Sequence, residues 1–157
     1  MVESDSMPAE EIVVRAMVES DLNEWFRLRQ LLWDRTPEDD HKVEMLDIIQ
    51  HPDTQAVFVA ESTGGALVGF LEAGIRPFVE DCETDNVGYL EGWFVEADYR
   101  RKGIGAALVK NAEDWARSRD CREMASDAEI GNELSIQAHT SLGYEETSRL
   151  VHLRKEL

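Results

Sequence analysis

The most informative stretch of the sequence reads Arg100-Arg101-Lys102-Gly103-Ile104-Gly105. It joins a β-prone run at residues 87–95 to residues 104–117, where apolar side chains recur at the spacing of an amphipathic helix. Glycines at the start of a helix let the backbone approach an anion closely, and the first amides of that helix lack partners within it. The stretch therefore predicts a phosphate-binding turn between a strand and a helix.

Other phosphate-binding patterns do not fit this stretch. Its two glycines lack the third glycine of a dinucleotide-binding fingerprint, and no Gly-Lys pair followed by Ser or Thr forms a P-loop. Three basic residues precede the glycines in a chain with 33 acidic and 16 basic residues and a net charge of −17. That balance disfavours nucleic acid and anionic membranes as partners and favours a cationic one, although an acidic surface can also serve solubility alone.

Outward from the turn, hydrophobic periodicity predicts an α/β fold: a mixed, mostly antiparallel sheet of about seven strands with about four helices on its faces. Residues 1–10 are polar, so we expect a mobile tail before a single domain at residues 11–157. Helices are expected after residues 20, 37, 103 and 131. Strands are expected at residues 12–16, 55–60, 66–71, 87–95 and 122–126 and near Glu145 and residues 151–153.

The pattern Arg100-x-x-Gly103-x-Gly105 resembles the acetyl-CoA-binding signature Arg/Gln-x-x-Gly-x-Gly/Ala of the GNAT acetyltransferase superfamily. Residues 28–33, 89–95, 121–127 and 139–147 are more narrowly similar to the aminoglycoside 6'-N-acetyltransferases. This resemblance implies acetylation of the 6'-amine of an aminoglycoside antibiotic by direct attack of the amine on the acetyl-CoA thioester, which gives antibiotic resistance. Two alternatives remain open: an acetyltransferase for a polyamine or a protein amino terminus, and a non-catalytic acetyl-CoA sensor.

The resemblance also implies which residues hold the cofactor. Those for the pantetheine arm and the pyrophosphate are Trp93, Phe94, Val95, Arg100, Arg101, Lys102, Gly103, Ile104 and Gly105. The series Asn132-x-x-Ser135-x-x-x-His139 resembles Asn-x-x-Ala/Ser-x-x-x-Tyr, in which the asparagine contacts CoA and the tyrosine faces its sulfur. His139 stands in the place of the tyrosine, and we expect it to act as general acid because imidazole titrates near neutral pH.

Acidic side chains are candidates for catalysis and for binding a cationic acceptor. Glu91 and Asp127 are rivals for the base that takes the proton of the attacking amine, and either could instead be an ion-pair partner or a turn cap. The resembling enzymes use aromatic side chains to border the acceptor cleft, so Trp25 is assigned to that border and Trp33 is considered with it, although both also suit a core or helix-packing role. Asp81 and Asp85 belong to an acidic loop, which would suit a polycation or be a solvated face.

Other features of the sequence restrict chemistry and location. Cys82 and Cys121 form no disulfide framework, and His41, His51 and His152 are scattered, so we expect no metal. No apolar run reaches the roughly 18 residues that span a bilayer, and we expect a cytoplasmic protein. Members of the resembling group are commonly dimers, so we expect a homodimer with the last strands as a possible site of association.

Overall fold

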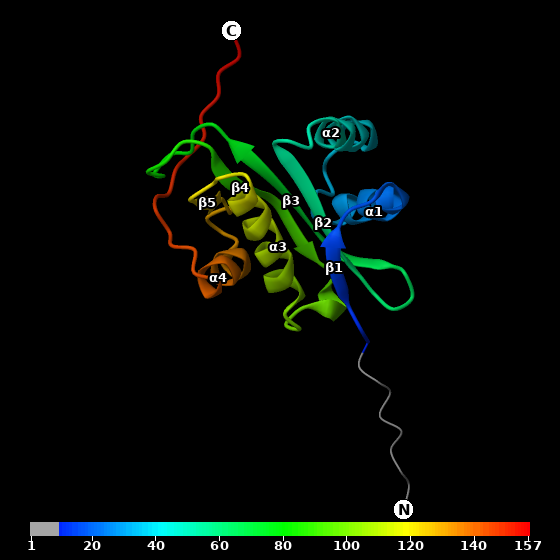
Figure 1. The fold of residues 1–157 in the computed structure, drawn as a ribbon. Helices are drawn as coiled ribbons and strands as arrows, with labels where there is room; N and C mark the ends of the chain where they lie inside the picture. Colours follow the sequence, from blue (N-terminus) through cyan, green and yellow to red (C-terminus); the bar gives the residue numbers. More distant parts are fainter. Residues whose placement is uncertain (1–9) are drawn as a thin grey trace, which may run out of the picture.

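The computed structural model describes residues 10–157, so most of the segment expected to be a mobile tail lies outside the described residues. Within this range the chain forms one sheet of five strands in the order β1-β2-β3-β4-β5, with four α-helices, which confirms the mixed α/β fold (Figure 1). The strands are β1 (Val13–Ala16), β2 (Gln55–Glu61), β3 (Leu67–Arg76), β4 (Val87–Val95) and β5 (Met124–Ser126). The helices are α1 (Leu22–Leu32), α2 (Glu38–Gln50), α3 (Ile104–Ser118) and α4 (Glu133–Ser141), with short 3-10 helices η1 (Glu19–Asp21) and η2 (Ala97–Tyr99).

Helices cover both faces of the sheet, and side chains that alternate along β2 supply both cores (Figure 1). Phe58 and Ala60 pack in a cluster with residues of α3, whereas Val57 and Val59 pack in a cluster with residues of α1. Because successive side chains of a strand point to opposite faces, a strand covered on both faces is buried throughout. This explains why eight consecutive residues of β3 are buried.

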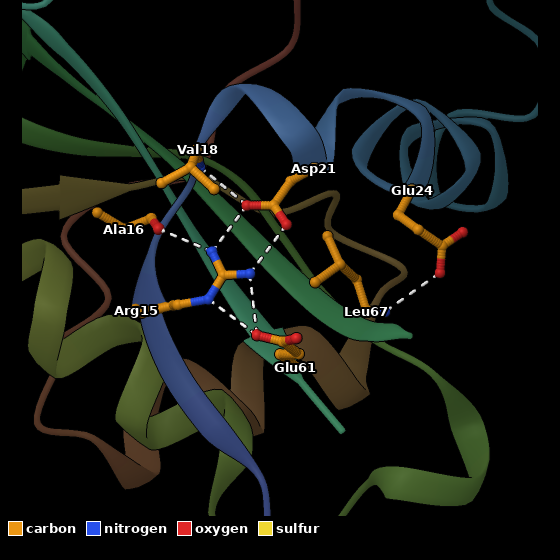
Figure 2. Close-up of polar contacts among 7 residues, drawn as sticks. All are labelled: Arg15, Ala16, Val18, Asp21, Glu24, Glu61 and Leu67. Carbon is orange, nitrogen blue, oxygen red and sulfur yellow. Dashed lines mark hydrogen bonds and ion pairs between the residues drawn. The ribbon is translucent and has the colours of Figure 1, made fainter. Parts of the chain in front are cut away.

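An ionic cluster ties β1 and β2 to the start of α1 (Figure 2). Arg15 of β1 donates to both carboxylate oxygens of Asp21, at 2.7 and 2.9 Å, and to Glu61 of β2 at 3.0 Å. Asp21 also accepts a hydrogen bond from the backbone amide of Val18 at 2.8 Å. The hydrogen bond from Arg15 holds the pKa of Asp21 below its usual value. The cluster therefore fixes the position of Asp21, from which α1 starts, relative to β1, and α1 then packs on one face of the sheet.

The sheet opens between β4 and β5. These parallel strands pair over three positions, of which the last joins Leu90 to Ser126. At the same level the register between β3 and β4 skips Glu91, which is therefore the extra residue of a β-bulge. Beyond the bulge, residues 91–95 have no strand on their β5 side in the described part of the chain. The backbone edge of β4 consequently faces a gap.

The prediction of two further strands near Glu145 and residues 151–153 is wrong for a single copy of the chain. Residues 144–157 contain no helix or strand, and their last part extends away from the body of the molecule (Figure 1). A segment becomes a strand only where a neighbour pairs with its backbone, and here it has none. The predicted helices and the hairpin of β2 and β3 are confirmed. In the region from residue 10 onward, no helix has the length and apolarity that a bilayer crossing requires.

Candidate functional site

The turn before α3 has the geometry of an anion site. Gly103 precedes the helix with a φ of 81°, a left-handed value that favours glycine, and no side chain caps this helix end. The first turn of α3 carries no acidic residue, so its amides and dipole meet no competing carboxylate there. Gly105 lets the helix approach β4, since a Cβ at this position would lie 3.1 Å from the ring of Trp93. The turn can therefore hold a phosphate group on backbone amides.

The basic residues of the turn differ in their contacts: one is hydrogen-bonded to the end of β4, and two are exposed to solvent. Arg100 donates from Nε to the carbonyl of Val95 at 2.8 Å and so closes the end of β4. Arg101 and Lys102 are exposed. The side chain of Ile104 is buried in the core, so only its backbone can face an anion. Arg101 and Lys102 are thus the side chains best able to neutralise phosphate charge.

The β4 residues beside the gap point to opposite faces. Trp93 lies on the α3 side, edge-on to His139 with ring centroids 5.1 Å apart, whereas Phe94 packs against Phe70 on the α1 side. The indole Nε1 of Trp93 is buried and has no hydrogen-bond partner among the described residues. A buried donor without an acceptor is unfavourable unless a ligand supplies one. This N–H, the open edge of β4 and the turn together fit a long ligand with phosphate at one end and amides along its length, as in CoA.

His139 on α4 is oriented through both ring nitrogens. Nδ1 lies 2.7 Å from the carbonyl oxygen of Ser135, and because a carbonyl only accepts, Nδ1 carries a proton. Nε2 lies 2.8 Å from Oγ of Ser126. Asn132 caps α4 by accepting the backbone N–H of Ser135 at 3.2 Å. The structure therefore brings His139 of the predicted series to the end of β5 and adds Ser126, which the sequence analysis did not single out.

Glu91 and Asp127 are linked through two intervening side chains at the open end of the sheet. Arg76 forms a two-pronged ion pair with Glu91 at 2.9 and 2.6 Å, and its guanidinium carbon lies 3.5 Å from the centroid of the Tyr89 ring. The Tyr89 hydroxyl donates a short hydrogen bond to Asp127. Burial, together with this hydrogen bond, raises the pKa of Tyr89, so the hydroxyl remains a donor at neutral pH. The ion-pair role considered for Glu91 is thus present, without removing its carboxylate from the site.

An acidic cavity of about 270 Å³ opens beside Glu91. Its lining includes the carboxylates of Glu44, Asp47, Glu72 and Glu91 and the ring of Trp33. Arg29 also lines the cavity, but four carboxylates against one guanidinium leave a net negative charge, which favours a ligand with several ammonium groups. The sequence analysis missed the first three, which come from α2 and β3. Only Glu72 carried a signal, because a carboxylate within an apolar strand requires a partner.

Arg29 of α1 is that partner. Arg29 and Glu72 are buried, with 1% and 4% of their surfaces exposed, and Arg29 donates short hydrogen bonds to both Glu72 and Glu44. Burial raises the pKa of Glu72, and the attraction of Arg29 opposes that shift. Trp25 donates its indole N–H to Glu72 at 3.0 Å and is completely buried. The prediction that Trp25 borders the acceptor cleft is therefore not supported: it lies beneath the cavity, and Trp33 lines the cavity instead.

The acidic loop lies outside this cavity. Asp81 and Asp85 are exposed, and neither belongs to the cavity lining. Asp81 accepts a hydrogen bond from Ser148, while Glu123 anchors the loop by accepting the backbone N–H of Thr84 at 2.6 Å. The structure thus keeps the two predicted acceptor-binding residues apart from the other acids. Across residues 10–157, no group of three or more His, Cys, Asp or Glu side chains has an arrangement that could hold a metal ion.

Comparison with known proteins places this geometry in a family. The sequence profile described as "Acetyltransferase (GNAT) family" matches residues 25–144. The chain belongs to the GNAT acetyltransferase family. Among the relatives of this GNAT chain, aminoglycoside N(6')-acetyltransferase type 1 of Klebsiella aerogenes is 38% identical over 155 residues, which cover 98% of this chain and 99% of that protein. The enzyme of the same name from Serratia marcescens is 39% identical, over 87% of this chain and 93% of that protein.

Solved structures confirm the GNAT fold. AAC(6')-Iy in complex with the bisubstrate analogue CoA-S-monomethyl-acetylneamine superposes with a TM-score of 0.88 at 36% identity, over 94% of this chain and 99% of that one. AAC(6')-Ih from Acinetobacter baumannii superposes with a TM-score of 0.87 at 37% identity, with the same coverage of both chains. The family resemblance carried by the Arg100 to Gly105 motif is therefore confirmed.

Proposed function

We propose that this GNAT acetyltransferase transfers the acetyl group of acetyl-CoA to the 6'-amine of aminoglycoside antibiotics and so gives resistance to them. One arrangement carries the proposal: the anion-binding turn and the acidic cavity adjoin the same segment of β4, with Trp93 beside the turn and Glu91 beside the cavity. A phosphate-bearing donor and a polycationic acceptor can therefore meet at the gap. The near full-length similarity to enzymes named aminoglycoside N(6')-acetyltransferase supports this choice of acceptor.

The chain's own groups divide between holding the donor and polarising it. The α3 turn, with Arg101 and Lys102, holds the pyrophosphate, and the open edge of β4 together with Trp93 Nε1 binds the pantetheine arm. Asn132 and Ser135, at the start of α4, are proposed to contact CoA as well. When bound, acetyl-CoA supplies an acetyl group activated as a thioester. Backbone amides of β4 aimed at its carbonyl stabilise the negative charge that develops as the amine attacks.

The carboxylates bind the acceptor and remove its proton. Glu91 lines the cavity and its side chain is partly exposed, so an acceptor ammonium can reach it, directly or through water. In this proposal Glu91 is the base, and Asp127, on the other side of Tyr89, holds the sugar amine by a charge-assisted hydrogen bond. Glu44 and Asp47 bind further ammonium groups, while Asp81 and Asp85 attract the polycation from the surface by long-range attraction.

We expect residues 11–157 to act as one catalytic domain in the cytoplasm. The net charge of −17 disfavours nucleic-acid and membrane partners, because both are anionic. His139 is proposed to supply the proton that neutralises the leaving thiolate, either directly or through a neighbouring hydroxyl group.

The C-terminal arm, residues 150–157, is the basis for proposing a homodimer. Leu150, Val151 and Leu153 are exposed, Leu153 by 91% of its surface, and β5 has no neighbour on its outer edge in the described part of the chain. If two copies exchange arms, the backbone of each arm can pair with the unpaired edge of β5 in the other copy, and the apolar side chains of the arm become buried. Light scattering should give a dimer for the full chain and a monomer after deletion of residues 150–157. A Val43→Ser variant, which alters another exposed apolar residue, should stay dimeric.

A single plate assay tests the proposed acceptor. Purified protein is mixed with acetyl-CoA and kanamycin, tobramycin, an aminoglycoside with a 6'-hydroxyl, spermidine or a short peptide, and free thiol is followed with a chromogenic disulfide reagent. Release with kanamycin and tobramycin, but not with the 6'-hydroxyl compound, is the expected result. Turnover only with spermidine or peptide would keep the family and overturn the acceptor. Binding of CoA without thiol release from any mixture would favour a sensor.

A further inference from the structure

Ser126 and His139 form a hydrogen-bonded pair at the fork of the sheet. Ser126 is the last residue of β5 that pairs with β4, and its Oγ lies 2.8 Å from Nε2 of His139 and 3.4 Å from the carbonyl oxygen of Leu90. Because Nδ1 of His139 donates to the Ser135 carbonyl at 2.7 Å, a neutral imidazole must accept at Nε2. In the neutral state, therefore, Ser126 donates its proton to His139, and the histidine has no proton to give at Nε2.

The pair lies on the opposite face of the sheet from the acceptor groups. Leu90 packs in the α3-side cluster, and Ser126, its register partner, points the same way to meet α4. Side chains alternate along a strand, so the neighbouring Tyr89 and Asp127 point to the other face, where they contact each other. The gap between β4 and β5 is consequently flanked by the acids on one face and by the Ser126 and His139 pair on the other.

We infer that Ser126 is the group that protonates the leaving thiolate of CoA. His139 is a positioning residue that orients the Ser126 hydroxyl and returns a proton to its Oγ. The inference rests on the proposed acetyltransferase function, in which the thioester lies in this gap. The Ser126 O–H bond breaks as an S–H bond forms, and Ser126 Oγ takes the Nε2 proton of an imidazolium His139. The imidazole that remains keeps its Nδ1 proton on the Ser135 carbonyl. Solvent returns one proton to Nε2 before the next turnover, and the proton of the amine leaves through Glu91.

Both protonation states of the pair are satisfied by the same geometry. When His139 is charged, Nδ1–H donates to Ser135 and Nε2–H donates to Ser126. The Ser126 hydroxyl proton is then free of His139, and the long contact with the Leu90 carbonyl at 3.4 Å is the acceptor that a thiolate in the gap would replace. The rings of Trp93 and Tyr144 flank the imidazole edge-on at 5.1 and 5.9 Å.

The charged and titratable groups around the pair come from β4, from α3 and from the segments that follow β5 and α4. Asp127 follows Ser126 in the chain and accepts the Tyr89 hydroxyl. From α3, Glu113 accepts the hydroxyl of Tyr144 at 3.0 Å, and burial raises the pKa of that tyrosine, which stays uncharged. The groups in direct contact with the imidazole, Ser126, Ser135, Trp93 and Tyr144, are therefore neutral at neutral pH.

A double-mutant cycle tests whether the two residues act as a unit. Ser126→Ala and His139→Ala should each lower kcat about 100-fold while leaving both KM values within about twofold, and the double variant should be no slower than the slower single variant. Ser141→Ala, a matched control on α4 whose hydroxyl bonds only to the Ala138 carbonyl, should retain full activity. Wild-type turnover by Ser126→Ala, multiplicative losses in the double variant, or raised KM values with unchanged kcat would each overturn the relay.

A second measurement does not depend on the acceptor. The pKa of the CoA thiol is measured on the protein by the ultraviolet absorbance of its thiolate, with CoA as the probe. A donor beside the sulfur stabilises the thiolate, so the thiol pKa should be lower on the wild-type protein than on Ser126→Ala, with CoA affinity the same for both. Equal thiol pKa values overturn the relay. If wild-type protein acetylates no aminoglycoside but still lowers the thiol pKa through Ser126, the acceptor proposal fails and the relay stands.

Discussion

The buried ion pair of Arg29 and Glu72 supports the floor of the acidic cavity, and Arg29→Met tests it directly. Methionine preserves most of the side-chain volume but removes the guanidinium, which donates to Glu72, Glu44 and, from Nε at 3.2 Å, to His41. The carboxylate of Glu72, only 4% exposed, then retains the indole N–H of Trp25 at 3.0 Å as its remaining strong donor. A buried charge without its counter-ion is the expected consequence.

The size of the effect follows from this burial. Removing one partner of a buried ion pair typically costs about 3–5 kcal/mol, because the other charge stays buried. Glu72 can relieve part of this by taking up a proton, since burial already favours its neutral form. We therefore expect a loss of about 3 kcal/mol in the free energy of unfolding. At roughly 3 °C per kcal/mol for a chain of this size, Tm should fall by about 9 °C.

Urea unfolding at pH 7, followed by tryptophan fluorescence, measures this loss. Lys110→Met is the matched control, because it breaks an exposed pair with Asp114 (2.8 Å), which solvent screens, so its removal should leave the stability nearly unchanged. The double variant Arg29→Met/Glu72→Leu should recover most of the stability, since no buried charge remains. If Arg29→Met matches the control, or if the double variant is less stable than the single one, the reasoning is refuted.

Three further perturbations separate catalysis, cofactor binding and pH-dependent stability. Glu91→Gln should lower kcat about 100-fold or more while changing the free energy of unfolding by less than about 1 kcal/mol, because its ion pair is exposed; unchanged thiol release would remove Glu91 as base. Gly105→Ala should weaken CoA binding about tenfold, equivalent to 1.4 kcal/mol, because its Cβ displaces Trp93; calorimetric titration with equal affinity for both proteins would contradict this. Asp21→Asn should lower the free energy of unfolding by about 2 kcal/mol at pH 7. Arg15 depresses the folded-state pKa of Asp21, so this contribution is present above the unfolded pKa of about 3.9 and is lost as pH falls through the folded-state pKa. If the stability difference between wild type and Asp21→Asn is the same at pH 7 and pH 3 in urea unfolding, the assignment is disproved.

The cofactor half of the candidate site was visible in the sequence because its groups are contiguous. A phosphate turn uses the backbone of a few successive residues, so glycines before a helical period are sufficient to place it. The α4 series was readable for the same reason, since Asn132 caps α4 and Ser135 and His139 lie on successive turns of it. In each case the local pattern specifies the positions of neighbouring groups without knowledge of the rest of the fold.

The acceptor half could not be read in this way. The cavity joins carboxylates of α2, β3 and β4, and the charge on Glu72 is tolerated only because Arg29 crosses beneath it from α1. Ser126 gained a role only when the end of β5 met His139. Trp25 lies within α1 and Trp33 caps its C-terminus, yet packing put the first in the core and left the second on the cavity wall.

The sequence by itself therefore determined the α/β class, the family and the phosphate-binding end of the site, because short-range spacing encodes each of them. Only the tertiary structure decided which acids share a cavity, which serine meets His139, and that residues 144–157 lack a strand partner within one chain. The physical reason is that these properties depend on contacts between segments far apart in sequence, whose meeting is set by how the helices and the opened sheet pack together.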